Sequence, residues 1–146
     1  MKLSTRTRYG VRLMTYLAQN YGKGPVYLKE IAGQEDISEK YLSLIVIPLR
    51  GAGLVNSIRG AYGGYELARE PSQITLKEIF DVLEGDYSLV NCVKNPSYCP
   101  RTPICPTRDI WVRVDREISE VLSSFTLADL IKIGEEKLGN AAAQDI

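Results

Sequence analysis

The stretch that most restricts the fold is GAGLVNSIRGAYGGYELA, residues 51–68. Two short β-prone runs, residues 54–58 and 65–67, flank a segment that contains three glycines, which is typical of a tight hairpin tip. A lone two-stranded hairpin is at best marginally stable in water, so it must pack against neighbouring elements. The segments before the hairpin therefore decide which kind of domain it completes.

Two short helices joined by a turn precede the hairpin. Apolar spacing predicts one helix over residues 28–33 and another over residues 39–50, with Ser38 as the N-cap of the second. Pro48 is expected to kink or shorten the second helix. The apolar residues expected to face the core from that helix are Leu42, Ile45, Val46 and Leu49. A helix-turn-helix followed by a hairpin predicts a winged helix-turn-helix.

The remaining segments also favour helices, so the expected fold class is mostly α with a small β-hairpin wing. A helix is predicted over residues 4–20, capped by Ser4 or Thr5. Thr75 to Glu78 form a capping box that opens a helix ending near Leu83.

A long amphipathic helix is predicted over residues 107–125. Its apolar residues are spaced by four, four, three and four positions, as at a coiled-coil contact: Ile110, Val114, Ile118, Val121 and Phe125. The helix could pack on its own domain, but a small winged domain rarely buries so long a seam. The pattern therefore favours a symmetric homodimer, which suits a helix-turn-helix protein that binds a palindromic operator.

Four regions follow from these elements. They are a winged helix-turn-helix DNA-binding domain at 1–85, a cysteine-rich loop at 86–106, a dimerisation helix and a short C-terminal helix at 107–139, and a flexible tail at 140–146.

The charge is unevenly distributed along a chain of zero net charge. Residues 1–60 carry nine basic and four acidic side chains, while residues 61–146 carry nine basic and fourteen acidic ones. A basic N-terminal region that contains a helix-turn-helix indicates DNA as the partner. The residues expected in the major groove are Ser38, Glu39, Lys40, Tyr41 and Ser43. The wing residues expected at the backbone or minor groove are Arg59, Gly60, Gly63 and Gly64.

The chain has no histidine, and this excludes several kinds of catalytic and metal site. Ser-His-Asp and Cys-His pairs, HExxH zinc proteases and Cys/His zinc fingers all need that side chain. The sequence also has no phosphate-binding GxxxxGK[ST] loop. An enzyme is not expected. No run of apolar residues is long enough to predict a membrane span or a signal peptide, so the expected location is the cytoplasm.

All three cysteines, Cys92, Cys99 and Cys105, lie in one loop that also holds four of the seven prolines. The polar surroundings argue against buried hydrophobic thiols, and the odd number argues against a disulfide framework. A single reactive thiol with two bystanders remains an alternative. Ligation of iron–sulfur or zinc is favoured, with one coordination position left for another ligand.

The chain resembles the IscR-like family of bacterial winged-helix regulators that sense iron–sulfur clusters. The matching stretches, which span roughly residues 1–135, are MKLSTRTRYG, GPVYLKEIA, ISEKYLS, LVNSIRGAYGGYEL and the cysteine loop ending in RDIW. The resemblance implies a homodimeric transcriptional regulator of a family whose members repress or activate genes, and a repressor is the expected class. It also implies a cluster held by Cys92, Cys99 and Cys105, with [2Fe–2S] favoured over [4Fe–4S]. The implied targets are genes of cluster biogenesis or of iron and sulfur metabolism.

The chain departs from relatives in two respects, the fourth ligand and the third helix. Arg108 stands where some relatives have a histidine ligand, and Arg8 and Arg12 occupy the region where others supply a carboxylate from the partner's first helix. Asp109 is the nearest alternative for the fourth ligand, although an acid in a first helical turn is also favoured by the helix dipole. Ser43 replaces a glutamate that discriminates between operators in some relatives.

Two other functions remain open from the sequence. One is a cluster-free regulator of sulfur or cysteine metabolism that responds to thiol oxidation or to a metabolite. The other is a zinc-binding adaptor that uses its winged helix for protein contacts.

Overall fold

The computed structural model describes residues 2–144. It contains seven α-helices and one two-stranded sheet within that range, together with three short 3₁₀ turns. The bounds of the helices and strands are α1 Thr5–Gln19, α2 Leu28–Glu35, α3 Glu39–Gly51, β1 Val55–Ile58, β2 Gly64–Leu67, α4 Leu76–Leu83, α5 Asn91–Lys94, α6 Pro106–Ser124 and α7 Leu127–Gln144.

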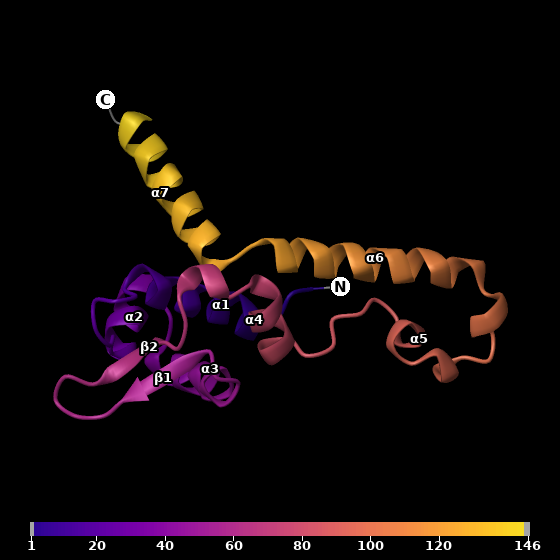
Figure 1. Ribbon diagram of the computed structural model, residues 1–146, viewed down its shortest axis with the longest axis horizontal. Coiled ribbons are helices and arrows are strands. Elements are labelled where there is room, and N and C mark those ends of the chain that lie inside the picture. Colours follow the sequence, from indigo (N-terminus) through magenta and orange to yellow (C-terminus); the bar gives the residue numbers. More distant parts are fainter. Residues whose placement is uncertain (1, 145–146) are drawn as a thin grey trace.

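Helices α1 to α4 and the hairpin pack around one core, seen at the left of Figure 1. β1 and β2 are antiparallel, with Val55 opposite Leu67 and Ile58 opposite Gly64. All buried hydrophobic side chains of the described chain lie in this body, between Leu13 and Leu83, except Leu127 at the start of α7. We call residues 4–85 the winged body.

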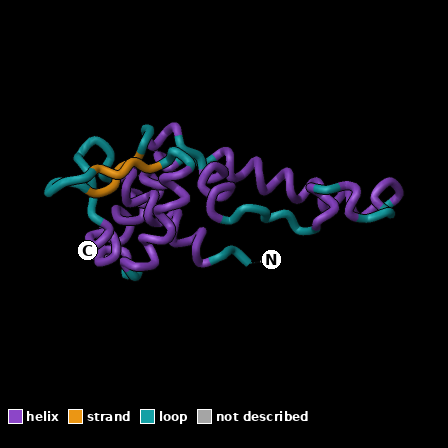
Figure 2. Tube along the Cα trace, turned by 90° about the horizontal axis from the view of Figure 1, so that it is seen from below, coloured by secondary structure: helices purple, strands orange, loops and turns teal. Residues whose placement is uncertain are grey.

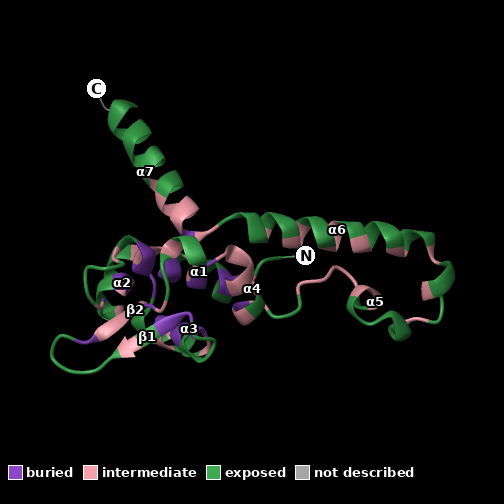
Figure 3. Cartoon of the chain, in the orientation of Figure 1, coloured by how far each residue is buried: buried purple, intermediate pink, exposed green. Residues whose placement is uncertain are grey.

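Residues 86–124 form a separate projection, which we call the thiol arm. Helix α6 runs away from the winged body, and α5 with the cysteine loop lies at its far end (Figure 1). Neither α5 nor α6 has a buried residue, and Figure 3 shows α6 as exposed and half-buried only. In the view from below, the loop and α6 again lie side by side, away from the strands (Figure 2).

The arm joins the winged body at the junction of α6 and α7. The backbone N–H of Leu76 donates to the Phe125 carbonyl at 2.9 Å, and that of Leu127 donates to the Ile74 carbonyl at 3.0 Å. Leu127 is fully buried, so its side chain anchors the same junction in the core. The C-terminal end of α6 is therefore fixed to the start of α4.

The caps predicted from sequence are present. Ser4 accepts a hydrogen bond from the Thr7 N–H and Ser38 accepts one from the Tyr41 N–H. Thr75 and Glu78 form the predicted reciprocal capping box. These bonds satisfy backbone donors that have no partner within the first helical turn.

Three expectations need correction. Pro48 does not shorten its helix, since α3 continues to Gly51. The last helix is not short, because α7 has 18 residues. Residues 140–144, expected to belong to a flexible tail, continue that helix, and residues 145–146 lie outside the described range. No helix within residues 2–144 is long and apolar enough to cross a membrane.

Candidate DNA interface and cysteine loop

Helix α3 and the hairpin lie together along the lower edge of the winged body, on the side away from α6 and α7 (Figure 1). α3 is amphipathic: Leu42, Ile45, Val46 and Leu49 are buried, as predicted. The opposite face of the helix is exposed. This arrangement leaves one face of α3 and the wing tip accessible to the same partner.

The polar residues predicted to contact DNA take different positions at the start of α3. Glu39 and Lys40 are exposed. Ser38 is occupied as the N-cap, and the Ser43 hydroxyl donates to the Lys40 carbonyl at 2.6 Å. Tyr41 turns inward and packs edge-on against Tyr9, with the ring centroids 5.8 Å apart. Lys40 is thus the exposed cation of this set.

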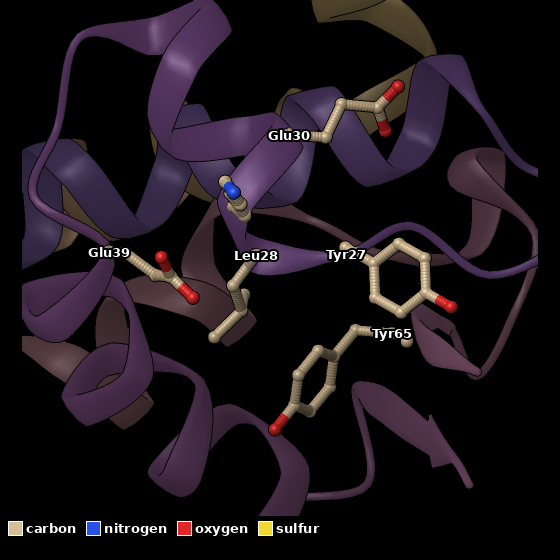
Figure 4. Close-up of a pocket in the computed structure, with 7 residues that line it drawn as sticks. Tyr27, Leu28, Glu30, Glu39 and Tyr65 are labelled. Atoms are coloured by element: carbon tan, nitrogen blue, oxygen red, sulfur yellow. The ribbon is translucent and has the colours of Figure 1, made fainter. Parts of the chain in front are cut away.

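A hollow of about 650 Å³ separates the start of α3 from the wing (Figure 4). Figure 4 shows the Glu39 carboxylate and Leu28 directed into it, with the rings of Tyr27 and Tyr65 on its other side. Glu30 also lines the hollow. Lys29 lines the hollow together with these two acidic residues, so it has no excess of positive charge, and DNA contacts are expected at the ridges on either side of it.

The wing is shaped by its glycines. Gly64 has φ +138°, and a Cβ there would lie 2.6 Å from the Val26 carbonyl oxygen. A Cβ at Gly63 would lie 2.2 Å from the Ile58 carbonyl oxygen, and Gly63 is buried. Any larger side chain would displace the hairpin, so the role of these two residues is to set the shape of the tip.

The tip itself presents exposed side chains. Arg59 and Gly60 are exposed, and Tyr62 is 92% exposed. The Tyr27 hydroxyl donates to the Ala61 carbonyl, which ties the tip to the start of α2. Neither Tyr27 nor Tyr62 was in the predicted set, although a tyrosine between wing glycines is a signal that sequence reasoning could have used.

Leu44 and Ile47 were also not predicted to be functional. They are 59% and 64% exposed on α3. They are the apolar residues of this helix that do not belong to the set spaced to face the core. Arg6 of α1 lies beside Leu44, because Arg6, Tyr41 and Leu44 border one shallow hollow of about 150 Å³.

The three cysteines lie at the far end of the thiol arm. All are free and partly exposed. Within residues 2–144, no three cysteine or acidic side chains lie close enough together to hold a metal ion. Asp109 is exposed in the first turn of α6. The loop thus carries the predicted ligands without gathering them into a site.

Cys105 is the N-cap residue of α6. Its sulfur lies 3.2 Å from the Thr107 hydroxyl. Hydrogen bonds from this hydroxyl, and then from the Arg108 backbone N–H, hold the pKa of the Cys105 thiol below its ordinary value. A thiol with a lowered pKa is the more reactive nucleophile and the better ligand.

One further contact holds the loop against α6, and one hydroxyl of the loop has no partner. The Arg108 Nε donates to the Cys92 carbonyl at 3.2 Å, which brings the first cysteine to the beginning of the helix. Thr102, between the other two cysteines, has a buried hydroxyl that finds no partner among the described residues. The loop therefore has hydrogen-bonding capacity that its own chain does not use.

The chain is similar to known proteins along most of its length. Residues 3–133 match the Rrf2 family, described as iron-dependent transcriptional regulators. The HTH-type transcriptional regulator CymR of Bacillus subtilis is 47% identical over 130 residues, which are 89% of each chain. The HTH-type transcriptional regulator IscR of Sodalis glossinidius is 35% identical over 145 residues, which cover 99% of this chain and 87% of that one.

Solved structures agree with these similarities. The structure of CymR, described as the global cysteine regulator of B. subtilis, has a TM-score of 0.77 at 46% identity and covers 91% of this chain and 98% of that one. The structure of T. potens IscR has a TM-score of 0.77 at 44% identity and covers 94% of this chain and 90% of that one. The predicted winged-helix fold and the resemblance to IscR-like regulators are confirmed.

Proposed function

The chain belongs to the Rrf2 family of transcriptional regulators, and we propose that it binds operator DNA as a homodimer and senses iron through a cluster at Cys92, Cys99 and Cys105. The observation that carries the sensing role is the position of three free thiols on one loop at the end of a helix anchored in the winged body. The family is one of regulators rather than enzymes, as the absence of histidine indicated. Acting on chromosomal DNA, the protein would work in the cytoplasm.

The DNA-binding role rests on the shared face of α3 and the wing. Lys40 on the helix and Arg59 at the wing tip are exposed cations on two ridges. In this arrangement α3 enters the major groove, and the wing reaches the backbone or the adjacent minor groove. Phosphate contacts by these side chains make binding steeply dependent on salt.

The dimer is supported by the part of the predicted α6 seam that its own chain leaves exposed. Ile110 and Val121 are 58% and 54% exposed, and Phe125 is 39% exposed, although all three belong to the predicted apolar seam. A second copy of α6 would remove these side chains from water and pair two winged bodies for a palindromic operator. A Val121→Glu variant should then sediment as a monomer, while Glu120→Gln, a change at the preceding exposed position, should remain dimeric.

The donor chemistry of the loop fits an iron–sulfur cluster. Three thiols are free, and Thr102 offers an unused hydroxyl of the kind that hydrogen-bonds to cluster sulfurs. The side chains do not stand together in the described structure, so binding requires the loop to close around the group. Asp109 is the proposed fourth ligand. When bound, the cluster supplies a redox- and iron-dependent signal, and [2Fe–2S] is the favoured type.

The link from loop to DNA runs along α6. Cys105 caps the N-terminal end of this helix, and two backbone hydrogen bonds fix its C-terminal end to α4. A change in the loop therefore alters how the arm sits against the winged body and, in a dimer, the spacing of the two α3 helices. Such a switch needs only a shift of a few kcal/mol between two populated arrangements. The proposed outcome is repression of genes of cluster assembly or of iron and sulfur metabolism.

A second function is favoured by one specific observation. The relative at 47% identity is CymR, and its solved structure is described as that of the global cysteine regulator. In this alternative the same DNA-binding body controls cysteine metabolism, and Cys105, with its lowered pKa, responds to oxidation directly without a cluster.

Anaerobic purification separates the two functions. The wild type and the Cys99→Ala variant are compared by absorbance, iron and acid-labile sulfide, and Ser97→Ala in the same loop serves as the matched control. A brown wild type and control with a colourless Cys99→Ala supports cluster sensing. A colourless wild type after anaerobic reconstitution, with DNA affinity that changes on peroxide treatment, supports the cysteine alternative. Failure to bind any DNA at low salt would favour the zinc-binding adaptor instead.

A further inference from the structure

Two large apolar side chains stand exposed on the outer face of α3. Leu44 is 59% exposed and Ile47 is 64% exposed. Residues three positions apart lie on one face of a helix, so the two side chains form a single strip. Leu42, Ile45, Val46 and Leu49 of the same helix are almost fully buried. The strip therefore does not belong to the core and needs a different partner.

Cations border the strip. Lys40 lies one turn before Leu44 on the same face, and Arg50 lies one turn after Ile47. Arg6 of α1 borders the shallow hollow beside Leu44. All three basic residues are exposed. The matching partner must combine apolar groups with negative charges on either side of them.

The strip also continues the surface formed by α3 and the wing. Both elements lie along the same edge of the winged body (Figure 1), and Arg59 extends the row of cations to the wing tip. Duplex DNA fits this combination. Its major groove displays one apolar group, the 5-methyl of thymine, and phosphates line both walls of the groove.

We propose that Leu44 and Ile47 read thymine methyl groups in the major groove, so that the operator carries thymines opposite α3. The inference rests on the proposed DNA binding and specifies its sequence preference. It also changes the expected mode of reading. Ser38 is occupied as a helix cap and Tyr41 is packed inward, so apolar contacts take a share of the discrimination that was assigned to polar side chains.

The expected effect follows from the size of one methyl group. Removing one buried CH₂-sized group from an apolar contact lowers affinity about fourfold, which corresponds to about 0.8 kcal/mol. A symmetric dimer makes each contact twice, so removing the methyl from both half-sites should lower affinity about 16-fold.

The test begins with selection of the preferred duplex from random DNA by the full-length protein. Each thymine of the selected half-site is then replaced by deoxyuridine, which lacks only the 5-methyl group. For the wild type, replacement at one or two particular thymines of the half-site should each lower affinity about fourfold. Leu44→Ala or Ile47→Ala should bind two duplexes with equal affinity when these differ only by thymine or uracil at the position that the missing side chain reads.

Matched variants keep the test interpretable. Leu138 on α7 is 75% exposed, so Leu138→Ala makes the same chemical change far from α3 and should retain full thymine preference. Leu44→Gln should instead favour adenine at its position, because a glutamine side chain pairs with the N6 and N7 of adenine. Circular dichroism shows whether each variant is folded, which the exposure of Leu44 and Ile47 leads us to expect.

The outcomes separate the two proposals. If no sequence is enriched and no duplex binds at low salt, the proposed DNA binding is wrong. If an operator is enriched but the wild type binds its thymine and uracil forms equally, methyl reading is overturned while DNA binding stands. If Leu44→Ala loses the same factor in affinity relative to the wild type on both forms, methyl reading is also overturned, because the side chain then contributes to DNA binding independently of the methyl group.

Discussion

The winged body and the thiol arm of this molecule are held together by different contacts. Every buried hydrophobic side chain of residues 2–144 lies in the winged body, apart from Leu127 at the junction. The arm has only exposed and half-buried residues, and its loop is held to α6 by an Arg108 hydrogen bond. The proposed DNA-binding surface therefore rests on a packed core, whereas the proposed sensing region has no buried core of its own.

The largest expected effect tests this contrast within one helix. Leu42→Ala should lower the free energy of unfolding by about 2–5 kcal/mol, because Leu42 is fully buried. Leu44→Ala, two positions along, should change it by less than about 0.5 kcal/mol. Urea denaturation at fixed protein concentration measures both. Comparable losses would mean that the outer face of α3 is covered by structure.

Next in size is the loss of a wing cation. Arg59→Ala should weaken operator binding about tenfold and lower the slope of log affinity against log salt by about 1, because one phosphate or groove contact is lost. Arg113→Ala on α6, whose side chain is 79% exposed, should change affinity less than twofold. Titrations by fluorescence anisotropy at several salt concentrations give both quantities. Similar losses of affinity for the two variants would mean that the thiol arm also contacts DNA.

A carboxylate that ties two ends of the winged body together gives a pH-dependent effect. Glu84 accepts hydrogen bonds from Ser4, at 2.5 Å from its Oγ, and from the Thr7 hydroxyl. These bonds hold the pKa of Glu84 below its ordinary value. Because the folded pKa is the lower one, the stabilisation is complete above the unfolded pKa of about 4.3 and disappears as the pH falls through the folded value.

Glu84→Gln should remove that part of the acid sensitivity. Thermal unfolding between pH 7 and pH 3 should show a smaller loss of stability on acidification for the variant than for the wild type. Glu70→Gln, at an exposed carboxylate of the winged body, is a comparison for the loss of one charge. Parallel acid profiles for the wild type and Glu84→Gln would contradict the role of this carboxylate.

A smaller effect is expected in the thiol arm. Thr107→Val should raise the pKa of the Cys105 thiol, because the hydroxyl that stabilises the thiolate is removed. Alkylation of the reduced, metal-free protein, resolved by mass spectrometry for each cysteine, should then shift to higher pH at Cys105. Thr102→Val in the same loop provides the control. If the pH dependence of Cys105 alkylation is the same in Thr107→Val as in the wild type, the N-terminus of α6, and not this hydroxyl, lowers the pKa of the thiol.

The smallest effect concerns the wing anchor. Tyr27→Phe removes the hydroxyl that donates to the Ala61 carbonyl, so the tip becomes freer and operator affinity should fall about two- to threefold. Tyr21→Phe, another exposed tyrosine of the winged body, should have no effect. Operator titration measures both. A loss as large as that of Arg59→Ala would show that the tip is disordered without this bond.

Local sequence signals predicted most of the secondary structure correctly. The caps at Ser4, Ser38 and Thr75 and the buried face of α3 depend on contacts between residues three or four positions apart. Such contacts can be recognised from spacing alone. The prediction of a flexible tail from residue 140 is wrong for residues 140–144, since α7 continues to Gln144.

The candidate site was predicted only in part. The structure has Lys40 at the start of a helix, Arg59 at the wing tip and the three cysteines in a loop, as the sequence placed them, and their roles stay predictions. It also placed Tyr41 on the DNA side, although this ring packs on Tyr9, a residue 32 positions earlier. That contact exists because α1 crosses α3, and no local pattern reports how two helices cross.

By itself, the sequence determined the order of the elements, the winged helix-turn-helix class and the gathering of thiols in one loop, because these depend on neighbours along the chain. Only the tertiary structure decided that Leu44 and Ile47 form an exposed strip, that Glu84 closes on Ser4 80 residues away, and that the cysteine loop lies far from the wing. The physical reason is that exposure and long-range contacts depend on how complete elements pack around one core, and packing is a property of the whole chain.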